Sequence, residues 1–213
     1  MKKIIVFDLD GTLVNTIYDI ANSMNKALEE YGFKTHSTAE YINFIGEGVI
    51  VLGKKAIGQE VSEEILNSVI IRYKEIYKRN LTNLSKPYPN MNEVLDELLS
   101  KGYKLGVISN KPHEDTKKVI NYYFPNKFSY VQGAKDGVSR KPSPMAMEIL
   151  INEFNLDISE VSYVGDSQYD AMFSENCGCD YYLFTYGYSK KEVLETYKPI
   201  AFLNESADLL KYF

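Results

Sequence analysis

The sequence predicts an α/β fold in which a parallel sheet carries an inserted all-helical domain. Short apolar runs rich in β-branched residues recur along the chain, and helical patterns separate most of them. The exception is the stretch between Asn15 and Leu84, where helical patterns follow one another with no strand between them. We therefore expect a core domain at residues 1–14 and 86–213 and a helical domain at residues 15–85.

The first predicted strand, residues 4–7, ends in two carboxylates. Asp8 and Asp10 are one residue apart, so they can point together to one side of the strand end. Gly11 lets the backbone leave the strand sharply. Carboxylates buried at such a place are costly unless a cation or hydrogen-bond donors compensate them. The alternative is a solvated turn in which both side chains are exposed.

The inserted segment shows apolar residues at helical spacing. Helices are expected at residues 16–31, near Ser37, at 49–57 and from about Ser62 to residue 77. Between the second and third of these lies Ile45-Gly46-Glu47-Gly48, which we expect to be a flexible loop.

Strands and helices alternate after Pro87. The expected strands are residues 105–108, 128–132, 161–164 and 182–184, and the expected helices lie near 94–99, 119–123 and 145–154 and after Ser189. Ser189 and Glu192 have the spacing of a capping box. This alternation predicts a parallel sheet covered by helices on both faces.

Polar clusters follow several of the predicted strands. In an open parallel sheet, ligands bind outside the carboxyl ends of the strands. The candidate residues at these ends are Asp8, Asp10, Ser109, Asn110, Lys141, Asp166 and Asp170. Each cluster alone could be an ordinary turn, an exposed lysine or a helix N-cap. Their occurrence in this order is far more specific.

The order and wording of these motifs resemble the haloacid dehalogenase superfamily, in its phosphatase branch. Asp8-Leu9-Asp10-Gly11-Thr12 is similar to the first family motif, Ser109-Asn110 to the second, Lys141 to the third and Gly165-Asp166-Ser167-x-x-Asp170 to the fourth. The resemblance covers essentially the whole chain and implies a Rossmann-like core with a helical cap domain. Ser109-Asn110-Lys111 resembles phosphoglycolate phosphatase-like members. Asn15 departs from the usual aspartate at the hinge into the cap.

The resemblance also implies a role for each motif residue. Asp8 would be the nucleophile and Asp10 the general acid and base. Mg²⁺ would be held by the Asp8 carboxylate, the Asp10 backbone carbonyl and Asp166, with Asp170 a nearby carboxylate. Ser109 and the Asn110 backbone would bind the phosphoryl oxygens, and Lys141 would offset negative charge. In the cap, Gly46, Glu47 and Gly48 form the candidate specificity loop, although Glu47 could equally be a solvated loop acid.

The implied activity is magnesium-dependent hydrolysis of a small phosphate monoester through an aspartyl-phosphate, with phosphoglycolate as a model substrate. Asp10 argues against a dehalogenase, because dehalogenases of this superfamily lack the second aspartate. A sugar-phosphate mutase resembling β-phosphoglucomutase, a pyrophosphatase and a non-catalytic binding protein stay open. A phosphonate-cleaving relative would need a cap lysine, for which Lys26, Lys54 and Lys55 are available.

The balance of charged residues argues against one class of binding partner. Acidic residues (29) outnumber basic ones (24), which argues against a general nucleic-acid binder.

No apolar stretch approaches the ~20 residues of a membrane span, and the N-terminal apolar run is too short for a signal peptide. Cys177 and Cys179 are interpreted as ordinary thiols near a helix end. We expect a cytoplasmic protein that binds a small phosphorylated metabolite; its oligomeric state is not indicated.

Overall fold

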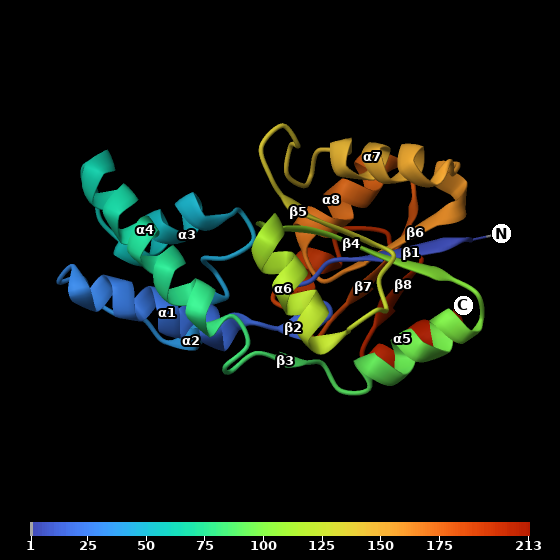
Figure 1. Ribbon diagram of the computed structural model, residues 1–213, viewed down its shortest axis with the longest axis horizontal. Coiled ribbons are helices and arrows are strands. Elements are labelled where there is room, and N and C mark those ends of the chain that lie inside the picture. Colours follow the sequence, from blue (N-terminus) through green and yellow to red (C-terminus); the bar gives the residue numbers. More distant parts are fainter. Residues whose placement is uncertain (1) are drawn as a thin grey trace. The chain divides into compact units, whose positions relative to one another are not determined.

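The computed structural model describes residues 2–213, which form two compact units (Figure 1). The first unit contains the chain up to Asn15 together with Pro87–Phe213, and the second is Thr16–Lys86. Two short strands, β2 (Val14–Asn15) and β3 (Lys86–Pro87), pair with each other at the two connections.

The first unit is built on a six-stranded parallel sheet, so the predicted α/β fold class is confirmed. In sheet order its strands are β5 (Tyr130–Ala134), β4 (Lys104–Pro112), β1 (Ile4–Phe7), β6 (Val161–Gly165), β7 (Asp180–Phe184) and β8 (Ala201–Leu203). Strand β1 is central, and Phe7 lies opposite Val107 of β4 and Val164 of β6. The carboxyl ends of these three strands therefore meet where the strand order reverses, which is the usual ligand position in such sheets.

Helices cover both faces of this sheet. They are α5 (Met91–Ser100), α6 (His113–Tyr123), α7 (Met145–Phe154), α8 (Gln168–Cys177) and the short α9 (Lys191–Leu194), with 3₁₀ turns at Ile158–Glu160 and Ser206–Lys211. Helices α7 and α8 lie on one face, and α5 and α6 on the other (Figure 1). All four residues of β1 are fully buried. A strand buried on both faces is expected to be continuously apolar, as this one is.

Three details differ from the sequence prediction. Strand β4 continues to Pro112, with an irregular register after Ile108. The prediction ended it at residue 108 because Ser109 and Lys111 are polar, although both are buried. Edge strand β8 was not predicted; it has three residues, of which only Leu203 is buried. The predicted Ser189 capping box is wrong, because α9 begins after Lys190 and has no side-chain cap.

Up to Lys86, where β3 begins, the second unit is built from helices: α1 (Ile17–Glu30), α2 (Thr38–Tyr41), α3 (Val49–Ile57) and α4 (Glu63–Asn80). Helix α1 packs against α4 along their apolar faces. Ser37 forms a capping box with Glu40, and Ser62 caps α4 by accepting from the Ile65 amide. The buried carboxylate of Asp19 accepts hydrogen bonds from the Leu84 and Ser85 amides, which fixes the returning chain onto α1.

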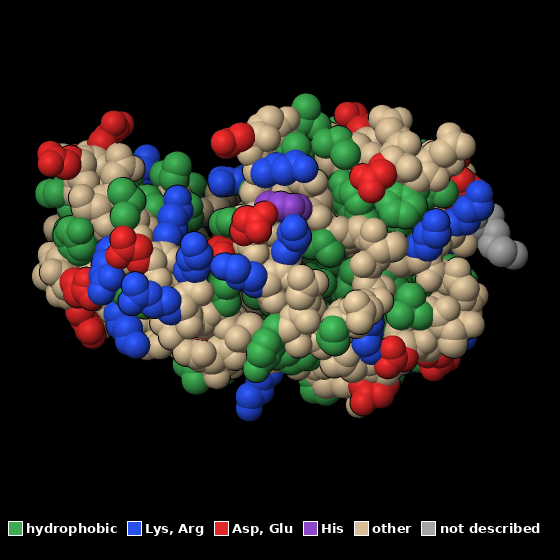
Figure 2. Space-filling view, in the orientation of Figure 1, with side chains coloured by type: hydrophobic (Ala, Val, Ile, Leu, Met, Phe, Trp, Pro, Cys, Tyr) green, Lys and Arg blue, Asp and Glu red, His purple; other side chains and the backbone are tan. Residues whose placement is uncertain are grey.

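On the face shown in Figure 2, basic and acidic side chains lie side by side. Within residues 2–213, every helix is too short or too polar to cross a bilayer.

Candidate active site

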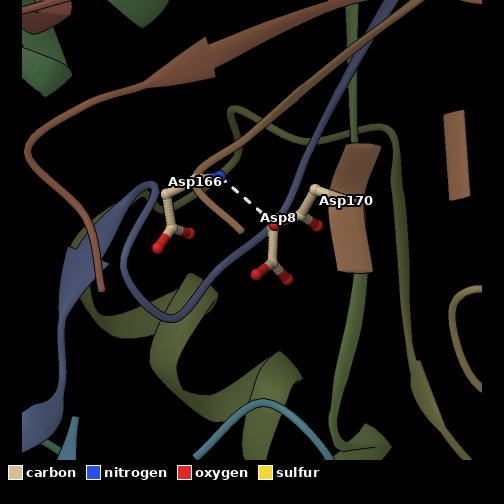
Figure 3. A group of neighbouring side chains, drawn as sticks. All are labelled: Asp8, Asp166 and Asp170. Atoms are coloured by element: carbon tan, nitrogen blue, oxygen red, sulfur yellow. Dashed lines mark hydrogen bonds between the residues drawn. The ribbon is translucent and has the colours of Figure 1, made fainter. Parts of the chain in front are cut away.

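Three buried carboxylates meet at the carboxyl ends of β1 and β6 (Figure 3). Asp8 directly follows β1, Asp166 directly follows β6, and Asp170 lies in the first turn of α8. One oxygen from each lies within 4.8 Å of the other two. The structure thus brings together three of the residues that the sequence singled out, and we call them the acidic cluster.

Lys141 is the positive charge of this site. Its Nζ lies 2.9 Å from Asp8 Oδ1, and it donates hydrogen bonds to Asp170 Oδ1 at 2.6 Å and to the Tyr163 hydroxyl at 2.9 Å. Its side chain is 3% exposed. Burial by itself lowers the pKa of this amine, but Asp170 and Asp8 outweigh burial and raise it above its usual value. Lys141 is therefore a fixed cation between two carboxylates.

Asp170 is held from several sides as an ionised group. Its Oδ2 accepts hydrogen bonds from the Ser167 hydroxyl at 2.6 Å and from the backbone amides of Ser167 and Asp166. Burial opposes ionisation, but Lys141 and these donors outweigh it and hold the pKa of Asp170 below its usual value. With its oxygens engaged in this way, Asp170 orients Lys141 and the turn that carries Asp166.

The negative charges of the Asp8 and Asp166 carboxylates are less well compensated than that of Asp170. Burial raises the pKa of Asp8 to about 6, although Lys141 counteracts part of this effect. Burial, together with Asp170 and Asp8, raises the pKa of Asp166 well above its usual value. Within the described residues Asp8 Oδ1 accepts no hydrogen bond of good geometry, despite the nearby Lys141.

The charge balance of this site fits a divalent cation. When all three carboxylates are ionised, the single ammonium leaves two negative charges uncompensated in a buried place. Mg²⁺ prefers oxygen ligands and needs only one or two protein carboxylates, and a bound cation would lower both raised pKa values. Asp8 and Asp166 are the residues suited to hold it, because Asp170 is already engaged by Lys141 and Ser167.

Asp10 is not one of the three carboxylates of the acidic cluster, but it lies close enough for its charge to act on Asp8. The two carboxylate oxygens of Asp10 accept hydrogen bonds from Lys111 Nζ at 3.0 and 3.2 Å. The sequence placed Asp10 beside Asp8 but gave no indication of this partner, which lies 101 residues further along the chain.

The Asn110 side chain binds the backbone of Lys141, and the expected role of the Asn110 backbone in phosphate binding stays a prediction. The side chain donates to the Lys141 carbonyl at 3.1 Å and accepts from the Lys141 amide at 2.9 Å. Ser109 accepts from the Lys111 amide at 3.3 Å. Ser109, Asn110, Arg140 and Lys141 also line a shallow pocket beside the carboxyl ends of β4 and β5. The Asn110 side chain therefore fixes the segment that carries Lys141.

The predicted specificity loop, Gly46-Glu47-Gly48, belongs to the helical unit. Glu47 forms an ion pair with Lys55 at 2.8 Å within that unit. Lys26, Lys54 and Lys55 also belong to the helical unit. The role of this loop stays a prediction.

The segment Tyr186-Gly187-Tyr188, after β7, was missed from sequence. The Tyr188 amide donates to Asp166 Oδ2 at 2.8 Å, and Thr12 Oγ1 donates to Asp166 Oδ1 at 2.7 Å. A Cβ atom on Gly187 would lie 2.2 Å from the Cβ atom of Asp166. Only glycine permits this approach, and a glycine between two tyrosines at a strand end was the available signal.

We expect Gly187→Ala to weaken Mg²⁺ binding at least tenfold, because the added methyl group must displace Asp166. The measurement is calorimetric titration of the metal-free protein with Mg²⁺. Gly106→Ala is the matched control, since its Cβ would meet neighbours at an ordinary 3.5 Å. Equal affinities for both variants would contradict the role of Gly187.

Comparison with known proteins gives a consistent result. The family model described as haloacid dehalogenase-like hydrolase matches residues 5–184. A phosphoglycolate phosphatase of Haemophilus influenzae (strain 86-028NP) is 34% identical over 98% of this chain and 96% of its own length. A phosphoglycolate phosphatase of Vibrio cholerae is 32% identical over 92% and 90%. The crystal structure of a predicted phosphoglycolate phosphatase from Haemophilus somnus superposes with a TM-score of 0.92 at 32% identity, covering 99% of this chain and 97% of that one.

Proposed function

The chain belongs to the haloacid dehalogenase-like hydrolases, and from that premise we propose that it hydrolyses a small phosphate monoester in a magnesium-dependent reaction. The observation that carries the proposal is the acidic cluster with Lys141 buried against it. Phosphoglycolate is the first substrate to test, because curated relatives that match nearly the whole chain are phosphoglycolate phosphatases.

Asp8 is the proposed nucleophile. Its carboxylate oxygen attacks the phosphorus atom, the bond to the ester oxygen breaks, and an aspartyl-phosphate forms on Asp8. A water molecule then attacks this phosphoryl group, which releases phosphate and restores the Asp8 carboxylate. Asp8 suits this role because it directly follows the central strand β1 and its carboxylate lies beside the Lys141 ammonium.

Asp10 is the proposed proton carrier. In the first half-reaction it gives a proton to the departing ester oxygen, and in the second it removes one from the attacking water. Its carboxylate is partly exposed, unlike the three carboxylates of the acidic cluster. Two carboxylates in such different surroundings can divide the two tasks between them.

The remaining residues stabilise charge. Lys141 neutralises Asp8 and the phosphoryl oxygens that approach it, and Ser109 offers a hydroxyl at the end of β4. Mg²⁺, held by Asp8, Asp166 and the Asp10 carbonyl, would supply further positive charge for the phosphoryl group. In the same proposal the helical unit is a cap, and Gly46, Glu47 and Gly48 select the leaving group.

The test is phosphate release from phosphoglycolate, a hexose phosphate, pyrophosphate and a phosphorylated peptide. We expect the small monoesters to be hydrolysed with Mg²⁺, and activity to disappear in chelator and return when Mg²⁺ is added. Ca²⁺ should restore little activity, because its larger and looser coordination shell misplaces the nucleophile. Full activity in chelator, or a preference for the peptide, would overturn the proposal.

A further inference from the structure

The pair formed by Asp10 and Lys111 is built into the site and is not a chance surface contact. The Lys111 side chain is only 2% exposed, and its Nζ reaches both oxygens of Asp10. A buried ammonium is costly unless a counter-charge compensates it, and ordering a long lysine side chain also costs entropy. The two hydrogen bonds to the Asp10 carboxylate compensate the buried charge and hold the lysine side chain in one position.

The backbone of Lys111 is held on both sides. Its amide donates to Ser109 Oγ at 3.3 Å, and its carbonyl accepts from Thr116 Oγ1 at 3.2 Å. Gly133 of the neighbouring strand β5 packs so closely that a Cβ there would lie 2.6 Å from the Lys111 carbonyl oxygen. The ammonium therefore extends from a rigid strand end, which is what a positioning residue requires.

Without this lysine, Asp10 would be a fourth negative charge close to the acidic cluster. Asp10 is two residues from Asp8, at the end of the same strand. Lys111 supplies the compensating charge and binds both oxygens of Asp10 from the end of β4.

We propose that Lys111 is a positioning residue that holds the Asp10 carboxylate beside the acidic cluster, in the orientation needed for proton exchange with the leaving group. This inference rests on the proposed phosphatase function, in which Asp10 is the proton carrier. Lys111 would act through Asp10 and not on the phosphoryl group.

The test compares two esters that differ in their need for a proton. The leaving group of phosphoglycolate is the alkoxide of glycolate, which requires protonation, whereas the leaving group of p-nitrophenyl phosphate is the stable p-nitrophenolate ion. The ratio kcat/KM reports the steps up to formation of the aspartyl-phosphate. Because general acid catalysis contributes about 10²–10⁴-fold, Lys111→Met should lower kcat/KM roughly 100-fold for phosphoglycolate and only about threefold for the aryl ester. Lys104→Met, which removes an exposed lysine at the other end of β4, should change neither ratio.

Two further measurements test whether Lys111 acts through Asp10. In an Asp10→Asn background, Lys111→Met should cause no additional loss with phosphoglycolate, because its target is already gone. In thermal unfolding of the metal-free protein, the two substitutions should be non-additive, a readout that does not depend on turnover. Equal losses for both esters, or additive unfolding effects, would overturn the role of Lys111. A wild-type protein inactive on every ester would instead overturn the phosphatase proposal.

Discussion

Asp8→Asn is expected to abolish phosphate release, with turnover reduced by roughly 10⁴-fold or more, as when other enzymes lose their nucleophile. The substitution keeps the size and shape of the side chain but removes the negative charge that makes the oxygen nucleophilic. Phosphate release from phosphoglycolate in saturating Mg²⁺ measures the loss. Mass spectrometry of the quenched wild-type reaction should show a phosphorylated peptide that contains Asp8, and the variant should not form it.

The same variant should remain folded and become more stable without metal. Burial raises the pKa of Asp8 to about 6, above its usual 3.8. The ionised carboxylate therefore destabilises the metal-free protein progressively as the pH rises from about 4 to above 6. Asp8→Asn lacks this effect, so its thermal midpoint should exceed that of the wild type at pH 7 and match it near pH 4. Asp96→Asn, at a carboxylate that is 65% exposed, is the control and should change neither property. A folded Asp8→Asn protein with a tenth of normal turnover would exclude Asp8 as the nucleophile.

The parts of the site carried by the strand ends were predictable from sequence. Asp8 directly follows a continuous apolar run, so a buried strand places a charged carboxylate in the interior. This conflicts with the usual preference of carboxylates for the surface. Asp166 presents the same conflict after β6. Such violations of local preference concentrate at functional sites, and the parallel arrangement of β1 and β6 places both residues at one edge.

What escaped prediction depends on contacts between distant segments. Nothing near Asp10 in the sequence specifies Lys111, and nothing near Asp166 specifies the Tyr188 amide. Asn110 was interpreted as a residue whose backbone binds phosphate or as part of a turn, and the bond of its side chain to the Lys141 backbone is a property of the fold. Strand β8 escaped because three edge residues give no periodic signal.

Lys141→Met should cost both activity and stability, in contrast to Asp8→Asn. Removing one partner of a buried ion pair typically costs about 3–5 kcal/mol, because a charge is left uncompensated. Without the Lys141 ammonium, the carboxylates of Asp170 and Asp8 both lose the cation that they contact in the wild-type protein. Turnover should also fall by about 10²–10³-fold, as when one preorganised charge-stabilising group is removed from an active site. Chemical denaturation and phosphate release measure the two effects.

A double variant tests the assignment of these two costs. In Lys141→Met with Asp170→Asn, the uncompensated carboxylate is removed together with the lysine, so most of the lost stability should return. Turnover should not return, because the phosphoryl group still lacks its ammonium partner. Lys191→Met breaks an exposed pair with Glu195 and should cost less than about 1 kcal/mol. If the double variant proved no more stable than Lys141→Met alone, the lysine would stabilise the fold through packing and not through its charge.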